Sequence, residues 1–171
     1  MFEPLDPRAW TEFFFTVATA SAALIGLIVV GLSIHADFIA QSITHRSHAR
    51  ATLVVLTAVM ITGLVALVPQ PPELAAWEFG LIAVGFVSIN TYNNTRALRQ
   101  VAWHLPAAAW RRMAIGYAVG ACGLVGAVSI VVFSGQGGGL YWIGLESVGG
   151  LTWAIAGAWR FLIGVVDETR P

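Results

Sequence analysis

Five long apolar stretches follow one another along the chain, and they limit its possible folds more than any other feature. Each is close to the roughly 20 helical residues that a hydrocarbon core of about 30 Å requires. They cover residues 10–35, 50–69, 74–93, 112–133 and 140–166. We therefore expect an all-α fold: a polytopic membrane protein in which residues 1–171 form a single membrane domain, a bundle of five transmembrane helices.

The composition supports this expectation independently. Hydrophobic residues make up 57% of the chain and charged residues 11%, and the mean hydropathy is +0.77. In an average soluble protein about a quarter of the residues are charged. The composition therefore excludes an ordinary soluble domain.

The arginines between the apolar stretches and at their ends fall almost entirely on one side of the expected membrane. Seven lie in, or at the edge of, the connections after the first and third stretches or after the fifth: Arg46, Arg50, Arg96, Arg99, Arg111, Arg112 and Arg170. Only Arg8 lies on the opposite side. Because short loops rich in basic residues stay in the cytoplasm, we expect the N-terminus outside and the C-terminus in the cytoplasm, which requires an odd number of spans.

Known catalytic, metal-binding and nucleotide-binding motifs are missing from the sequence, so we expect no enzymatic activity, no cofactor and no metal site. The chain has no lysine, which excludes a Schiff base with retinal. Cys122 is the only cysteine, so an internal disulfide is impossible and a small apolar filler is its simplest role. The histidines lie on the cytoplasmic side, at spacings that favour neither a metal nor a haem site: His35, His45, His48 and His104.

The fifth stretch has two contrasting faces at helical spacing. Small, polar and charged residues share one face: Glu146, Gly150, Trp153, Gly157, Arg160 and Gly164. Apolar residues share the other: Val148, Leu151, Ile155, Trp159, Leu162 and Val166. A charge in hydrocarbon costs several kcal/mol unless it is paired or hydrated. We therefore expect the first face to look inward and the second to face lipid, and we expect Arg160 to contact a carboxylate, helix carbonyls, a lipid phosphate or water.

Stripes of small residues also mark the first and fourth stretches. The first has a small and polar face: Glu12, Thr16, Thr19, Ala23 and Gly26. Its other face is apolar: Phe14, Val17, Ile25, Ile28 and Leu32. Small residues let helices approach closely in lipid, so the small face of the first stretch is expected to pack against another helix, within the bundle or in another subunit. Positions predicted for helix packing, within the bundle or between subunits, are Gly116, Gly120, Gly123, Gly150 and Gly157.

Three glutamates lie on three different stretches, all in the outer third of the expected membrane: Glu12, Glu78 and Glu146. One interpretation is a vestibule that attracts cations, or a proton site, because carboxylates in a low-dielectric setting must be protonated, hydrogen-bonded or neutralised by a cation. The other is that Glu12 and Glu78 lie near helix ends, where water and the helix dipole tolerate an acid. Glu146 lies roughly 9 Å into its stretch, so the sequence singles it out as the main candidate for an ion-binding or conduction site.

The segment from Trp10 to Ile34, WTEFFFTVATASAALIGLIVVGLSI, has an aromatic entry, an alanine-rich middle and a Gly-Leu-x-x-Val-x-Leu-Ser exit. It resembles the first span of small bacterial membrane proteins, mostly from actinobacteria, that are often named modulators of the FtsH protease. The resemblance covers about the first fifth of the chain. It implies a regulatory partner and carries no catalytic residues.

These patterns lead to two hypotheses about function. The first is a small oligomeric protein of the bacterial inner membrane that binds or conducts cations through a glutamate-lined outer vestibule. The second is a non-catalytic accessory or regulatory subunit of a larger membrane complex, such as a membrane protease or an energy-transducing complex. Expected partners are further copies of the chain or that complex, and membrane lipids.

The connection between the third and fourth stretches combines arginines with Leu98, Val101, Trp103 and Trp110. This mixture predicts a helix in the headgroup layer that binds anionic lipid at the cytoplasmic face. Nucleic acid is not expected as a partner.

Overall fold

The protein is all-helical, as expected. In a computed structural model, residues 7–34, 36, 43–100, 107–132 and 138–169 are described, with side chains described over 10–34, 36, 46, 49–95, 110–111, 113–132 and 138–159. These residues form five helices: α1 (Pro7–Ile34), α3 (Ile43–Leu67), α4 (Pro72–Gln100), α5 (Ala107–Val132) and α6 (Gly139–Thr169).

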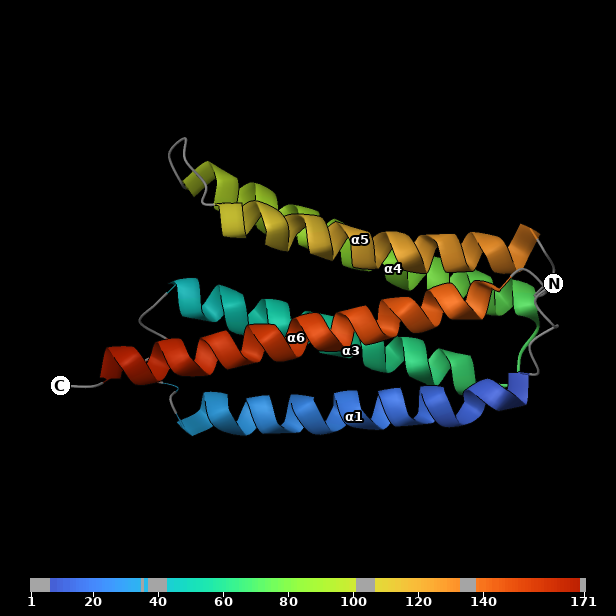
Figure 1. The fold of residues 1–171 in the computed structure, drawn as a ribbon, viewed down its shortest axis with the longest axis horizontal. Coiled ribbons are helices and arrows are strands. Elements are labelled where there is room, and N and C mark those ends of the chain that lie inside the picture. The colour runs from blue at the N-terminus through green and yellow to red at the C-terminus, as the bar shows by residue number, and fades with distance from the viewer. Residues whose placement is uncertain (1–6, 35, 37–42, 101–106, 133–137, 170–171) are drawn as a thin grey trace.

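The five helices run alternately up and down (Figure 1). Short connections enforce this order, since only residues 68–71 separate α3 from α4 and residues 133–138 separate α5 from α6. The backbone N–H groups of Leu74 and Ala75 donate to the Pro71 carbonyl and so close the first turn of α4. Gly138 takes a positive φ of 70° immediately before α6, a conformation that glycine adopts at no steric cost.

Four of the helices are long and apolar enough to cross a membrane: residues 10–34 of α1, 49–67 of α3, 72–95 of α4 and 113–132 of α5. Over its described residues, α6 is not among them. Glu146 and five glycines, Gly139, Gly144, Gly149, Gly150 and Gly157, lower its hydropathy there. The fifth span therefore stays a prediction.

The observed helices extend beyond the apolar stretches at the end of the bundle that carries the arginines. The helix α3 begins at Ile43 rather than near 50, and α4 continues to Gln100 rather than ending near 93. Leu98 belongs to α4 and Trp110 to α5, so the described residues do not form the separate headgroup helix expected in this connection. Val101 and Trp103 lie outside the described residues.

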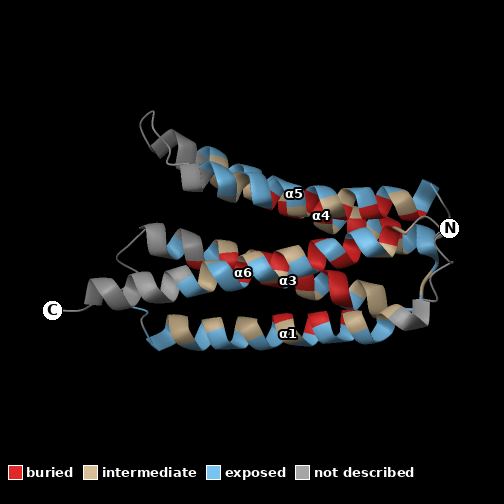
Figure 2. Ribbon diagram, in the orientation of Figure 1, coloured by how far each residue is buried: buried red, intermediate tan, exposed pale blue. Residues whose placement is uncertain are grey.

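The outward surface is apolar, which suits a lipid environment better than water. Large hydrophobic side chains are exposed on every helix, for example Leu27 on α1, Leu64 on α3, Trp77 on α4, Val132 on α5 and Trp159 on α6. Figure 2 shows buried residues confined to the sides of the helices that face one another.

The interior consists of two hydrophobic clusters along the bundle. The first surrounds Phe14 and Ile143, with Trp10 packed edge-on against Phe13 and Tyr141 at ring distances of 5.4 and 5.1 Å. The second cluster combines α1, α3, α4 and α6: Val17, Val55, Leu56, Val59, Phe86 and Ala154.

The small and polar face of the first stretch does not pack inside this bundle. All five residues of its small and polar face are exposed: Glu12, Thr16, Thr19, Ala23 and Gly26. Phe14 and Val17, on the opposite face, are buried in the core. The reason is that Thr16 donates to the carbonyl of Glu12 at 2.8 Å and needs no interior partner, whereas the aromatic face fills the space between α3 and α6.

Candidate functional site around Glu146

Glu146 is buried inside the bundle, with 8% of its surface exposed. It lies on the second turn of α6 and points at α5, where Gly123 provides the room. A Cβ added at Gly123 would lie 2.5 Å from both carboxylate oxygens of Glu146. The carboxylate therefore occupies the space that any side chain at position 123 would need.

A small cavity adjoins this carboxylate. Its volume is about 10 Å³, and its polar lining comes from Glu146, Ser147 and Thr62. The remaining wall is apolar and comes from α3, α4 and α5: Val55, Ala58, Val59, Phe86 and Val119, with Gly150 of α6 beside them. This volume is at the lower limit for one water molecule, so the site accommodates a proton or one very small guest and is too small for a hydrated ion.

Among the described residues, no hydrogen bond or ion pair compensates the Glu146 carboxylate. The neighbouring Ser147 hydroxyl donates to the Ile143 carbonyl at 2.9 Å instead. Burying an ionised carboxylate without a partner is far more costly than burying its neutral form. The arrangement therefore favours a proton on Glu146 or a cation beside it.

The other two predicted glutamates stand in different surroundings. Glu78 of α4 is half-buried and accepts a hydrogen bond of 2.8 Å from Gln70 Nε2, which also reaches the Val65 carbonyl at 3.4 Å. This bridge ties α4 to the end of α3. Glu12 is exposed on the outer face of α1. All three lie toward the end of the bundle where α1, α4 and α6 begin (Figure 1), and the structure gives no contact among them.

The glycines predicted for helix packing lie at contacts between helices of this one chain. On α5, Gly116 faces Asn90 and Gly120 faces Val87, both on α4, so this part of the stripe packs α5 against α4. On α6, the glycines face α3: Gly150 lies against Val59, and Gly157 lies 3.1 Å, measured from an added Cβ, from Thr52 Oγ1. The glycines of α5 thus have two partner helices: Gly116 and Gly120 face α4, whereas Gly123 faces α6.

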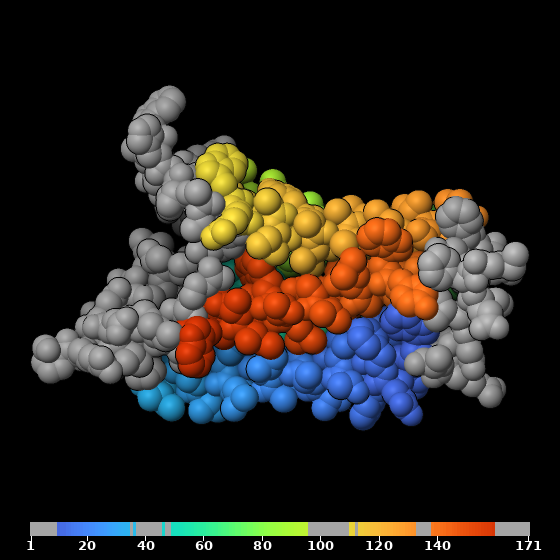
Figure 3. Space-filling model, viewed as in Figure 1, coloured from blue at the N-terminus to red at the C-terminus, as the bar shows by residue number. Residues whose placement is uncertain are grey.

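On the visible face of the molecule, α6 lies between α1 and α5 (Figure 3). The described part of α6 agrees with the two expected faces at most positions: Glu146 and Gly150 are buried, whereas Val148, Ile155 and Trp159 are exposed. Leu151, which was expected to face lipid, is instead half-buried and packs against the second hydrophobic cluster. Arg160 belongs to α6, but its side chain lies outside the described residues, as do those of the four histidines. Within the described part of the chain, no three His, Cys, Asp or Glu side chains are grouped to hold a metal ion.

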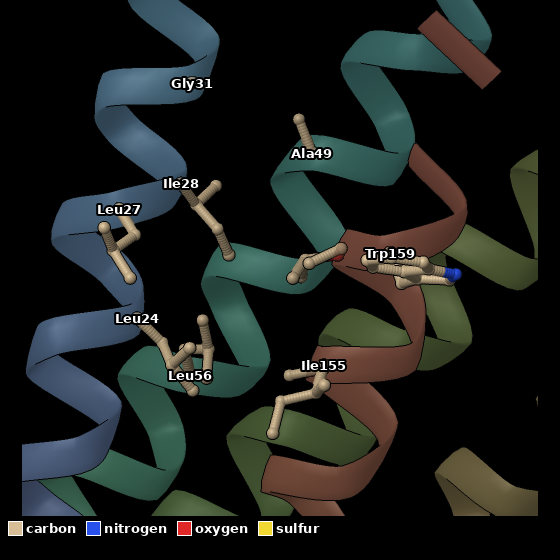
Figure 4. A pocket seen from close by; sticks show the side chains of 11 residues that line it. Leu24, Leu27, Ile28, Gly31, Ala49, Leu56, Ile155 and Trp159 are labelled. Atoms are coloured by element: carbon tan, nitrogen blue, oxygen red, sulfur yellow. The ribbon is translucent and has the colours of Figure 1, made fainter. Parts of the chain in front are cut away.

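Two larger grooves lie toward the opposite end of the bundle. One, of about 220 Å³, is lined by α1, α3 and α6, whose Leu27, Ile28, Leu56 and Ile155 converge on it (Figure 4). The other, of about 790 Å³, is lined by α1, α3 and α4, and includes Arg46 and Arg50. Only the second combines apolar walls with charged side chains.

The sequence pattern did not reveal two residues of the Glu146 site. Thr62 and Ser147 were not singled out, although Thr62 is 2% exposed beside the cavity. Away from this cavity, the Nδ2 of Asn90 is buried without a hydrogen-bond partner against Gly116. Thr62 and Ser147 are isolated polar residues in apolar stretches, a pattern that can indicate a buried polar site. The pattern does not tell which helices are neighbours.

Comparison with known proteins gives no relative from which a role could be transferred: no family model, curated protein or solved structure matches the chain.

Proposed function

We propose that the chain is a multi-pass protein of the bacterial inner membrane that crosses it five times, with the N-terminus outside and the C-terminus in the cytoplasm. Three observations support this. Four helices have the length and hydropathy of spans, the five helices alternate in direction (Figure 1), and the arginines gather at one end. In this arrangement α6 crosses with its acid turned away from lipid.

We further propose that the protein is a small, non-catalytic oligomer that binds or conducts cations, with Glu146 as the central site. The observation that carries this proposal is a buried carboxylate beside a cavity of about 10 Å³ without a compensating partner among the described residues. Intramembrane acids are rare because they are costly, and they commonly mark proton or ion sites. Glu12 and Glu78 at the same end would raise the local cation concentration.

The size of the cavity favours a proton over a larger cation. A hydrated metal ion does not fit a space at the limit for one water molecule, and Thr62 and Ser147 offer only two further oxygens. A proton needs no such space, because it converts the buried carboxylate directly to its neutral form.

The test is Glu146→Gln, with proton and cation flux measured in reconstituted vesicles under an imposed potential. We expect a loss of at least about tenfold in flux, because the amide keeps the shape and hydrogen-bonding capacity but cannot exchange a proton or hold a cation. Glu73→Gln is the matched control, since Glu73 is an exposed acid in the first turn of α4. Equal flux in Glu146→Gln and wild type, or no flux in wild-type vesicles, contradicts the proposal.

A second candidate function, an accessory subunit of a larger membrane complex, is supported by the exposed small face of α1. This face presents Thr16, Thr19, Ala23 and Gly26 outward, and side chains of that size allow another helix to approach closely. The resemblance of the first span to the FtsH-modulator group makes a membrane protease one candidate partner. Loss of a high-mass assembly on native gels of membrane extracts upon Ala23→Leu would favour this role over ion binding.

A further inference from the structure

The groove between α3 and α4 has the shape and charge pattern of a lipid site. It has a volume of about 790 Å³ and lies on the side of α3 that faces α4, with the end of α1 at its edge. Figure 1 shows the α4–α5 pair diverging from the other helices toward the end where the C-terminus lies. The groove follows this divergence.

Two arginines lie at one end of the groove. Arg46 and Arg50 are four residues apart on α3, so they share a face one turn apart. Both are exposed and lie at the start of the apolar part of α3, so in the proposed membrane arrangement the two guanidinium groups lie near the membrane surface. No acidic residue is among the described lining residues, and neither arginine is ion-paired with a described residue.

The rest of the wall is almost entirely apolar and has the depth of one lipid leaflet. Leu53, Val54 and Ile61 continue along α3, and Ile82 and Ile89 of α4 face them across the groove. From Arg50 to Ile61 the helix rises roughly 16 Å, about half of a hydrocarbon core of about 30 Å. An acyl chain whose phosphate lies at the arginines would fill this length.

We propose that this groove binds an anionic phospholipid, with its phosphate at Arg46 and Arg50 and an acyl chain between α3 and α4. Guanidinium groups bind phosphate through paired hydrogen bonds as well as through charge. The bound acyl chain covers the apolar walls that α3 and α4 present to the groove. This site is separate from Glu146 and does not depend on what Glu146 binds.

The proposal is tested by native mass spectrometry of the protein from nanodiscs that contain phosphatidylglycerol in a phosphatidylcholine background. The double variant Arg46→Gln/Arg50→Gln should lose its preference for phosphatidylglycerol by about 30-fold, and each single variant by about 5-fold. The control is Arg8→Gln, because it also removes one arginine charge but lies in the first turn of α1, at the opposite end of the bundle from the groove. An equal loss in the control, or no loss in the double variant, overturns the proposal.

A second variant tests the apolar part of the groove. Gly85 lines it, and a Cβ added there would meet nothing within 4 Å. Gly85→Leu should therefore fill the groove without a clash and reduce the retained phosphatidylglycerol, whereas Ala121→Leu, on an exposed face of α5, should leave it unchanged. If Gly85→Leu leaves lipid retention unchanged and alters only the oligomeric state, the groove holds a second copy of the chain and the lipid proposal is wrong.

Discussion

At the scale of single residues, Glu146 and Gly123 depend on each other. The acid occupies the space that a side chain at position 123 would fill, and the three atoms nearest to a Cβ added there all belong to the acid. Gly123 therefore differs from the other glycines of the α5 stripe, because it leaves space for a carboxylate and not only for a neighbouring helix.

Gly123→Ala should lower the free energy of unfolding by about 1–3 kcal/mol, since overpacking forces neighbouring groups apart. The added Cβ would lie 2.5 Å from both carboxylate oxygens. Gly26→Ala is the control, because a Cβ there would meet nothing within 4 Å. Denaturant unfolding followed by tryptophan fluorescence measures both.

A double variant shows whether the carboxylate is the cause. In Gly123→Ala/Glu146→Ala the obstructing group is gone, so the two effects should not add. If Gly123→Ala unfolds like the Gly26→Ala control, or if the two costs are additive, the close contact between α5 and α6 at this position is not as described.

At the scale of helices, the spacing of polar residues indicated the buried face of α6 but not that of α1, for one physical reason. A buried charge has no inexpensive alternative, so Glu146 determines which face of α6 turns inward. The threonines of α1 have an alternative, since Thr16 bonds to its own helix. Polar spacing was therefore informative where a carboxylate was present and misleading where hydroxyls were present. The neighbours of Glu146 could not be predicted, because they depend on which helices pack side by side.

Two adjacent phenylalanines test the orientation of α1. Phe14 is 1% exposed and Phe15 is 62% exposed, so the same substitution probes opposite faces of the helix. Phe14→Ala should reduce the free energy of unfolding by about 3–5 kcal/mol, the usual cost of an emptied core position, and Phe15→Ala should cost much less. Chemical denaturation in detergent micelles compares them. A larger loss of stability in Phe15→Ala than in Phe14→Ala would mean that the face with Glu12 and Thr16 looks inward.

At the scale of the whole molecule, the alternating order of five helices places the two ends of the chain at opposite ends of the bundle (Figure 1). The order of the helices is the same whichever way the protein is oriented in a membrane. Its orientation is predicted from the distribution of the arginines. The number of spans and the side of each terminus are therefore separate questions from the fold.

Reporter fusions answer them. A reporter fused after Pro171 should be active in the cytoplasm, and one inserted in the connection 133–138 should be active outside, because the arginine distribution keeps the opposite ends of the helices inside. A third fusion in the connection 68–71 serves as an internal reference for the outer side. Finding the C-terminal and 133–138 reporters on the same side would remove α6 as a span.

The close fit between Glu146 and Gly123 also bears on how the chain enters the membrane during synthesis. Over its described residues, α6 is not among the helices apolar enough to cross by hydropathy alone, and it leaves the ribosome after α1, α3, α4 and α5. By then α3 and α5 can present the recess beside Gly123 and Thr62 in which the acid comes to rest. In the proposed five-span arrangement, we therefore expect the last helix to insert only after its neighbours have assembled.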